Sequence, residues 1–342
     1  MAKDQEHITG EAKETHLADY APSRARSRGI LLAALMALVV FSLSWYLLAP
    51  SKGVDLVAAD TTTAGSLSSY DPFYMLLIGS DSRKGTALYT GNTTEEGQKI
   101  IRADVLTLVR VNPREETVTF VSIPRNTLSI GSDAKINEWL EEGNPQRTIE
   151  EVEKLTGIEI DYYALVNFAG FEEIIDAIGG VVIDVPDDAS FLDPLTGREV
   201  HVSAGPRQQL NGAEALAVVS SWEKSNELES LRQVSIRAVE RGILNAAAQG
   251  DEDHIRRIAT VFNSNVKTNL EDSLLLALML DYATSKDDYT VYFGSGPYRG
   301  SVDKEGSFTV FRDASTWKRL MDVVDEGGDP NSVVVTLASG SD

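Results

Sequence analysis

The segment Ile30–Ala49 constrains this chain most, because it reads ILLAALMALVVFSLSWYLLA and contains no charged residue. About twenty apolar residues are the length that an α-helix needs to cross the hydrocarbon core of a bilayer. Arginines precede the segment and aromatic rings lie near its far end, at Arg24, Arg26, Arg28, Trp45 and Tyr46. Positive charge marks the cytoplasmic side, and Trp and Tyr favour the interface. The sequence therefore predicts a single-pass protein of the cell membrane with a cytoplasmic N-terminus and an extracytoplasmic C-terminal domain.

Two other interpretations of this segment stay open. A cleaved signal peptide has a shorter apolar region, of about 7–15 residues, and ends in a small-residue pattern that Leu47–Pro50 lacks. A buried core helix is the second, although three arginines beside so apolar a run are not typical of one.

The rest of the chain predicts one domain behind a linker. Residues 1–29 are polar and mixed in charge, which is typical of a disordered cytoplasmic tail. Residues 50–70 are rich in Ser, Thr, Ala and Gly, as flexible linkers are, and residues 71–342 follow as the domain. The chain has no cysteine, so no disulfide framework supports the fold. The net charge of −21 argues against nucleic-acid binding.

Apolar runs alternate with turn residues through this domain. We expect strands at 74–78, 104–111, 117–123, 160–166, 181–185, 289–293 and 333–337, and helices at 148–155, 168–178, 212–219, 229–248, 252–265 and 270–284. The second and third strands form a hairpin through the turn at 112–116. Residues 187–209 are expected to be irregular. The alternation predicts an α/β fold with a central, mostly buried β-sheet flanked by helices.

Charged residues lie at the ends of three expected strands. Asp81 and Arg83 follow the first strand, Arg102 and Asp104 begin the second, and Arg125 follows the third. Carboxylates hold Mg²⁺, and arginine binds phosphate through paired hydrogen bonds. If the strands are neighbours, the pattern predicts a site for Mg²⁺ and a pyrophosphate. Ordinary surface ion pairs are the alternative, since Asp and Arg are common at strand ends.

Other common chemistries lack support in the sequence. The histidines, at His7, His16, His201 and His254, have no metal-ligand spacing. No G-x-S-x-G elbow and no glycine-rich phosphate loop is present. A serine hydrolase, a zinc enzyme and a nucleotide enzyme are therefore poorly supported.

Several segments resemble the LytR-CpsA-Psr family of cell-envelope proteins. They are LLIGSDSR (76–83), RADVLTLVRVNP (102–113), VSIPRNT (121–127), KIN (135–137), EKLTGIEIDYYALVNFAGFEEIIDAIGGVVIDVP (153–186), LNGAEALA (210–217) and VKTNL (266–270), the last in a part expected to be helical. The resemblance covers about residues 72–285. It implies an extracytoplasmic domain behind a single membrane helix.

The resemblance also implies a function. Members of the family look like phosphotransferases that move a glycopolymer from an undecaprenyl-pyrophosphate carrier to peptidoglycan or, in some cases, to protein. The lipid is implied to lie in an apolar groove between sheet and helices, where Phe168 and Phe171 are candidate contacts. By resemblance the metal ligands for Mg²⁺ are Asp81 and Asp104, the catalytic residues are Arg102, Asp104 and Arg125, and the pyrophosphate-binding residues are Arg83, Arg102, Arg125, Arg232 and Gln233.

One segment departs from the family pattern. Residues that usually carry charge in the family are here Ser220, Trp222 and Glu229 in place of arginines, and Asn126 and Asn226 in place of aspartates. Losing guanidiniums that face a phosphate weakens transfer. A second hypothesis therefore stays open, a non-catalytic paralogue that binds lipid-linked glycans or regulates envelope assembly.

Overall fold

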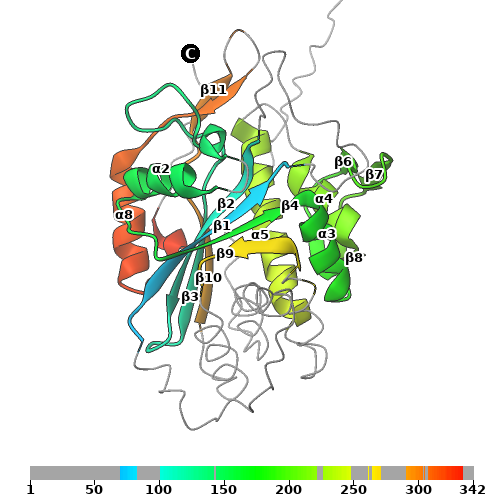
Figure 1. Ribbon diagram of the computed structural model, residues 1–342, viewed down its shortest axis with the longest axis horizontal. Coiled ribbons are helices and arrows are strands. Elements are labelled where there is room, and N and C mark those ends of the chain that lie inside the picture. Colours follow the sequence, from blue (N-terminus) through cyan, green and yellow to red (C-terminus); the bar gives the residue numbers. More distant parts are fainter. Residues whose placement is uncertain are drawn as a thin grey trace, which may run out of the picture.

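The computed structural model describes residues 70–82, 101–141, 144–221, 226–247, 261, 264–270, 290–302, 304 and 307–333. A six-stranded mixed sheet forms its centre, in the order β10-β3-β2-β1-β4-β9 (Figure 1). In chain order these strands are β1 (Phe73–Ser80), β2 (Ala103–Asn112), β3 (Thr117–Ser122), β4 (Tyr162–Asn167), β9 (Val266–Thr268) and β10 (Thr290–Ser295). β1 runs parallel to β4 and antiparallel to β2, which pairs with β3 as the predicted hairpin. The predicted α/β fold is confirmed.

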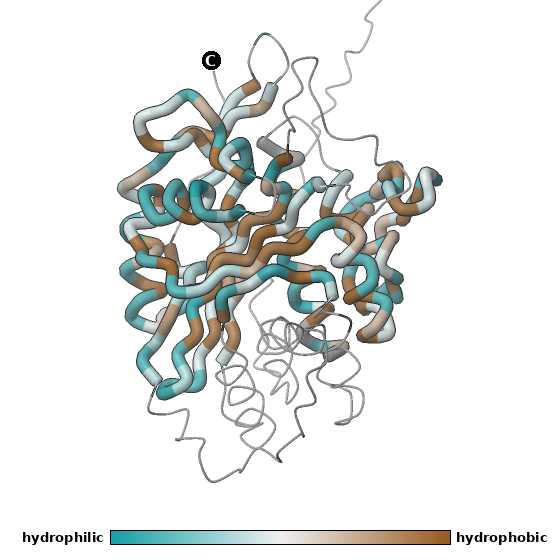
Figure 2. Tube along the Cα trace, viewed as in Figure 1, coloured by the Kyte–Doolittle hydropathy of each residue, from teal (hydrophilic) through white to brown (hydrophobic). Residues whose placement is uncertain are grey.

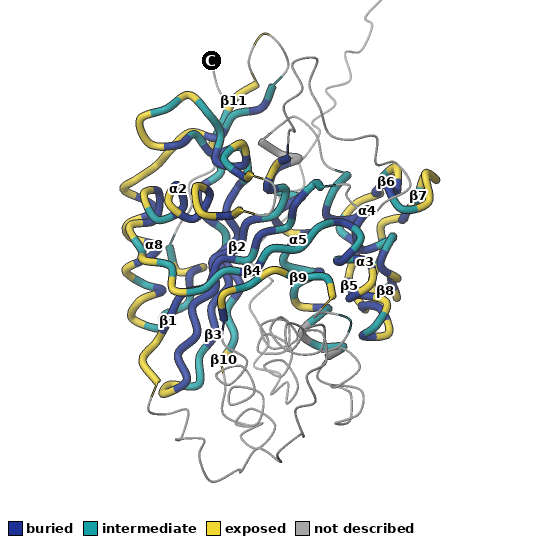
Figure 3. Tube along the Cα trace, viewed as in Figure 1, coloured by how far each residue is buried: buried dark blue, intermediate teal, exposed yellow. Residues whose placement is uncertain are grey.

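Helices cover both faces of the sheet (Figure 1). On one face lie α3 (Phe168–Ala177), α4 (Gly212–Ser220) and α5 (Asn226–Ala247), and on the other lie α2 (Gln146–Thr156) and α8 (Ala314–Asp325). Side chains alternate across a strand, so that Met75 and Val109 join the first apolar core while Leu76 and Leu108 join the second. Figures 2 and 3 show the result, central strands that are apolar and buried.

Cap residues end the helices where the sequence predicts. Gly157 adopts a left-handed conformation, φ 75°, and its N–H donates to the Glu153 carbonyl at 2.8 Å, which closes α2. Asn211 begins α4 through a capping box with Glu214. These local signals fix the helix ends independently of packing, which is why the boundaries agree closely with the expected ones.

Two sequence-based expectations were wrong. Residues 187–209 are not irregular: they contain β6 (Ala189–Leu192) and β7 (Glu199–Val202), which pair with each other, and most of β8 (Gly205–Leu210), which pairs with β5 (Val181–Val185). VKTNL forms strand β9 and not a helix, because it pairs with β4. The C-terminal part adds elements that were not expected: β11 (Gly300–Val302), β12 (Phe308–Val310), α8 and the short helix η4 (Pro330–Ser332).

Other expectations fall wholly or mainly outside the described residues. These are the tail and linker, the helices at 252–265 and 270–284, the strand at 333–337 and the membrane segment 30–49. Within the described residues, no helix has the length and apolar character that crossing a membrane requires. The division of the chain into tail, anchor, linker and domain stays a prediction.

A buried carboxyl pair makes the stability of the fold depend on pH. Glu172 on α3 and Asp193 are 6% and 2% exposed. Burial and the neighbouring Asp193 charge raise the pKa of Glu172 from 4.5 to about 8. The folded state therefore holds a proton that the unfolded state loses above pH 4.5, so stability falls as pH rises from 4.5 through about 8.

We expect Glu172→Gln to remove this dependence, because the amide keeps the shape without the charge. At pH 8.5 the variant should be more stable than the wild type by on the order of 2 kcal/mol, measured by urea unfolding across pH. Glu150→Gln on exposed α2 serves as the control and should leave the pH profile unchanged. A variant that still loses stability between pH 5 and 8 would assign the dependence to other groups.

Candidate active site

The predicted strand ends meet at one edge of the sheet. Ser80 at the end of β1 lies opposite Asn167 at the end of parallel β4 and opposite Ala103 at the start of β2. The register between β1 and β2 shifts between Gly79 and Ser80, which leaves Asp104 on β2 without a partner on β1, and irregularities of this kind are often found beside active sites. The backbone N–H of Asp81 then donates to the Arg102 carbonyl at 3.0 Å. The sheet thus brings the segments after β1 and before β2 together.

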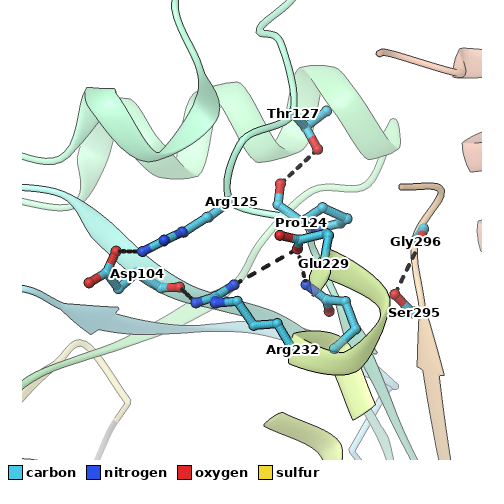
Figure 4. A network of polar contacts seen from close by, with 9 residues as sticks. Asp104, Pro124, Arg125, Thr127, Glu229, Arg232, Ser295 and Gly296 are labelled. Atoms are coloured by element: carbon cyan, nitrogen blue, oxygen red, sulfur yellow. Dashed lines mark hydrogen bonds and ion pairs between the residues drawn. The ribbon is translucent and has the colours of Figure 1, made fainter. Parts of the chain in front are cut away.

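Two guanidiniums converge on Asp104 at this edge (Figure 4). Nη1 of Arg125, from the segment after β3, donates to the Asp104 carboxylate. Nη2 of Arg232, from α5, donates to the Asp104 backbone carbonyl. Arg125 is partly exposed, at 22% of its side chain, whereas Arg232 is only 1% exposed. The structure therefore unites three of the predicted residues from separate elements.

Arg232 belongs to a buried polar cluster on α5. Its Nη1 lies 3.9 Å from Oε1 of Glu229, which also accepts a hydrogen bond of 2.7 Å from Nε2 of Gln233. Burial, with the nearby Arg125 charge, lowers the pKa of Arg232 to about 10, so the side chain stays charged at neutral pH. Among the described residues, Nε and Nη1 of Arg232 and Nε of Arg125 are buried without a hydrogen-bond partner. Such donors are suited to an anion.

Two carboxylates at the site suit a divalent cation whose remaining ligands are oxygen atoms of a substrate phosphate. Oδ1 of Asp81 accepts a hydrogen bond of 2.6 Å from the Arg102 backbone N–H. Burial, together with the nearby Asp104 charge, raises the pKa of Asp81 from 3.8 to about 6, which indicates that the two carboxylates lie close together. No cluster of three or more His, Asp or Glu suited to a metal occurs in the described part of the chain. Mg²⁺ commonly uses one or two carboxylates plus phosphate oxygens, and this donor set matches that pattern.

An apolar cavity of about 140 Å³ adjoins the charged cluster. The sheet forms one wall, and α3, α4 and α5 form the others. Both predicted lipid contacts, Phe168 and Phe171, line it, and so does Asp104. The remaining lining residues are Leu77, Ile78, Gly79, Ser80, Val105, Ala164, Val166, Asn167, Ile174, Leu216, Val219, Ser220, Ile236, Val239, Glu240 and Ile243. One ligand with an apolar chain and an anionic head would fit this arrangement.

The remaining predicted residues have mixed positions. Arg102 is exposed and contributes its backbone N–H, while Gln233 is fully buried on α5 and bonds Glu229. Arg83 and Trp222 lie outside the described residues. Ser220 lines the apolar cavity at the end of α4. At this position the small hydroxyl adds volume to the cavity and no charge.

Sequence reasoning missed one polar pair in the cavity wall. Oγ1 of the fully buried Thr107 donates to Oε1 of Glu240 at 2.6 Å. Oε2 of Glu240 is buried and has no hydrogen-bond partner among the described residues. Burial raises the pKa of this carboxyl to about 7, although Thr107 and Arg237 lower it. The sequence signal for this pair was the acidic Glu240 among the apolar positions of the helix.

The sheet, the apolar cavity and the Asp/Arg cluster define an α/β protein in which an apolar cavity adjoins a group of guanidiniums. The chain belongs to the LytR_cpsA_psr family, whose model matches residues 47–310. Two curated relatives from Bacillus subtilis are polyisoprenyl-teichoic acid–peptidoglycan teichoic acid transferases. TagV is 29% identical over 295 residues, covering 80% of this chain and 72% of TagV. TagU is 31% identical over 225 residues, covering 64% of this chain and 66% of TagU.

Solved structures agree on the fold. The crystal structure of B. subtilis TagV matches with a TM-score of 0.58 and 26% identity, over 75% of this chain and 96% of TagV. A LytR-Csp2A-Psr enzyme from Actinomyces oris matches with a TM-score of 0.56 and 22% identity, over 77% of this chain and 92% of that enzyme, and so supports the fold alone.

Proposed function

We propose that this chain is a phosphotransferase that moves a glycopolymer from a polyprenyl-pyrophosphate carrier to peptidoglycan, or to a protein. The observation that carries the proposal is the apolar cavity whose wall includes Asp104, the residue on which Arg125 and Arg232 converge. The part of the apolar chain next to the head group would fill the cavity while the pyrophosphate meets the guanidiniums. The names of TagV and TagU, teichoic acid transferases, support the same reaction class.

The proposed reaction is a phosphoryl transfer. An acceptor hydroxyl oxygen forms a bond to the phosphorus that carries the glycan, and the bond from that phosphorus to the bridging oxygen breaks. Polyprenyl monophosphate leaves, and water takes up the hydroxyl proton. Arg125 and Arg232 would stabilise the charge that gathers on the phosphate oxygens. Mg²⁺ held by Asp81 and Asp104 would offset further phosphate charge when bound.

The location of the substrate supports a membrane-bound protein. A polyprenyl carrier keeps its chain in the bilayer and presents its head group at the surface. The apolar segment Ile30–Ala49 would hold the domain near that surface, with the domain outside the cytoplasm.

The direct test gives full-length protein in liposomes a polyprenyl-pyrophosphate glycan, Mg²⁺ and peptidoglycan. We expect covalent attachment of the glycan and release of polyprenyl monophosphate. Lipid binding without turnover would favour the second hypothesis, a non-catalytic paralogue. The observation behind that hypothesis is the acidic Glu229 beside Arg232. Absence of both binding and turnover would reject both functions.

Arg125→Ala should lower turnover about 10²-fold, because it removes one charge-stabilising donor. The melting temperature should change little, since the side chain is partly exposed at 22%. Arg114→Ala, which removes an exposed ion pair with Asp71, is the matched control for losing an arginine. A large fall in melting temperature with unchanged turnover would instead make Arg125 a structural ion-pair residue.

Asp81→Asn should abolish a stabilisation that Mg²⁺ and pyrophosphate produce together. At about a hundred times the dissociation constant, a ligand stabilises the folded state by about 2.7 kcal/mol. We expect the wild type to melt at a higher temperature with both ligands than with pyrophosphate alone, and the variant to show no such difference. Asp133→Asn is the control, because Asp133 lies in the turn before η3 (Ile136–Trp139). Equal Mg²⁺ responses in wild type and Asp81→Asn would contradict the proposed ligand.

A further inference from the structure

A second cavity lies against the same strand ends as the apolar one. It has a volume of about 320 Å³, and it shares Ser80 and Asn167 with the apolar cavity. These two residues face each other at the ends of the parallel strands β1 and β4. The two cavities therefore adjoin at the edge of the sheet where the charged cluster lies.

The second cavity combines apolar surfaces with polar side chains of opposite charge. Ile101 and Leu140, both buried, contribute apolar surface, whereas Ser82, Glu141 and Lys267 contribute polar atoms. Glu141 and Lys267 are exposed and carry opposite charges, and Glu141 also lies 3.6 Å from Nη1 of Arg147. The neighbouring Arg125 and Arg232 favour an anion, whereas the described lining residues of this cavity carry one positive and one negative charge. Its chemistry suits a neutral ligand with many hydroxyl and amide groups and some apolar faces, which describes a carbohydrate.

Asp81 lies between two residues of the polar cavity wall. Its chain neighbours Ser80 and Ser82 both line the polar cavity, and the charges of Asp104 and Arg125 act on its carboxyl group. Phosphoryl transfer needs the attacking oxygen and the leaving oxygen roughly in line on opposite sides of the phosphorus. A donor in the apolar cavity would leave the polar cavity as the route of approach for the acceptor.

We infer that the polar cavity lined by Ser82, Glu141 and Lys267 binds the acceptor, a neutral glycan whose hydroxyl group attacks the donor phosphate. This inference rests on the proposed function for its chemistry. It adds a binding site that can be tested without the donor, because a glycan should bind the cavity by itself.

The test compares Lys267→Ala with a matched lysine variant in full-length protein. Lys267 is exposed, and β9 pairs with β4 through its backbone, so the substitution preserves the strand. The control is Lys318→Ala on α8, because Lys318 is exposed and lines a separate cavity of about 370 Å³ between α2 and α8. In a second variant, Ser82→Phe, the larger side chain fills the polar cavity, so this variant tests the cavity independently of Lys267.

Three measurements follow: binding of a neutral chain of N-acetylglucosamine by NMR, transfer to that chain, and hydrolysis of the donor with water as acceptor. We expect Lys267→Ala to weaken glycan binding and raise the KM for glycan about tenfold, as loss of a hydrogen bond to a charged group would. Ser82→Phe should abolish glycan binding. Donor hydrolysis should be the same in wild type, Lys267→Ala and Lys318→Ala. Peptide-free peptidoglycan glycan, which carries a carboxylate on each repeat, is the second arm and tells whether the site also accepts an anionic glycan.

The outcomes separate the two claims. Glycan binding that Lys267→Ala and Ser82→Phe leave unchanged overturns the acceptor site, whatever the turnover. Glycan binding that both variants weaken, in a protein with neither transfer nor hydrolysis, supports the site and rejects the proposed transferase. A wild type that binds no glycan at millimolar concentration overturns the acceptor site.

Discussion

Replacing Arg232 with methionine is expected to lower turnover by about 10²–10³-fold, the cost of losing one preorganised donor. The side chain is 1% exposed, and its Nη2 donates to the Asp104 carbonyl. Its Nε and Nη1 have no hydrogen-bond partner among the described residues. Leaving donors unpaired in a buried site costs free energy. A phosphate would remove this cost on binding, and for this reason we expect the effect to appear in both donor affinity and turnover.

The substitution of Arg232 also affects the stability of the fold, and the experiment must separate this effect from the effect on turnover. Without the guanidinium, Glu229 keeps its hydrogen bond to Gln233 but loses the positive charge 3.9 Å away. Breaking one partner of a buried ion pair can cost about 3–5 kcal/mol. Adding Glu229→Gln to Arg232→Met removes both charges and keeps an acceptor for Gln233. We expect this double variant to regain stability and remain inactive.

Glu229→Gln alone completes the comparison. It removes a negative charge from the donor side of the cluster, so we expect tighter binding of pyrophosphate, measured by calorimetry. Arg147→Met, an exposed arginine on α2, controls for loss of an arginine elsewhere. Activity restored by the double variant would show that Arg232 serves the fold and not the reaction.

The meeting of the strand ends could be predicted because it depends on local signals. The hairpin turn pairs β2 with β3, so that Asp104 and Arg125 must lie at the same edge. The apolar runs of β1 and β4 predict buried strands, and their parallel pairing brings Ser80 beside Asn167. The sequence therefore predicts the meeting of Asp104 and Arg125, whereas Arg83 lies outside the described residues and Arg102 contributes its backbone N–H.

The other half depends on tertiary contacts that the sequence pattern does not contain. β9 is three residues long and exists because β4 offers it hydrogen bonds, so its composition alone did not predict a strand. The strands β6 and β7 are four residues long, and the polar–apolar alternation of β7 is too short to predict a strand by itself. Glu229 reads as a lost charge in the sequence, but in the structure it is a buried partner of Arg232 and Gln233. Which charges are buried together can be known only after the helix has packed on the sheet.

The second large effect concerns Glu240 in the wall of the apolar cavity. We expect binding of the polyprenyl chain to weaken as pH rises through and above about 7, the value to which burial raises the pKa of this carboxyl group. An apolar chain removes the remaining water from the cavity, and a charged carboxylate without water is costly. The chain therefore binds best when Glu240 is protonated. If only that form binds, affinity falls tenfold for each pH unit above the pKa.

The groups around Glu240 determine how the test must be controlled. Arg237 on α5 lowers the pKa of Glu240, and Thr107 on β2 donates to its Oε1 at 2.6 Å. Asp104 is the other carboxylate in the cavity wall, and its partner is Arg125. Glu240→Gln keeps an acceptor for Thr107 and cannot ionise. It should bind the chain equally at pH 6 and pH 9, with the affinity of the wild type at low pH.

The measurement is binding of a fluorescent polyprenyl phosphate and of a polyprenyl alcohol between pH 6 and 9. The alcohol has no charge to titrate, so a pH dependence that it shares with the phosphate must come from the protein. Glu150→Gln on exposed α2 should behave as the wild type does. A pH dependence that survives in Glu240→Gln would assign the effect to Asp104 or to the arginines at the cavity edge. If the pH dependence disappears in Glu240→Gln and persists in Glu150→Gln, the Glu240 carboxyl group is the cause of the pH-dependent lipid binding.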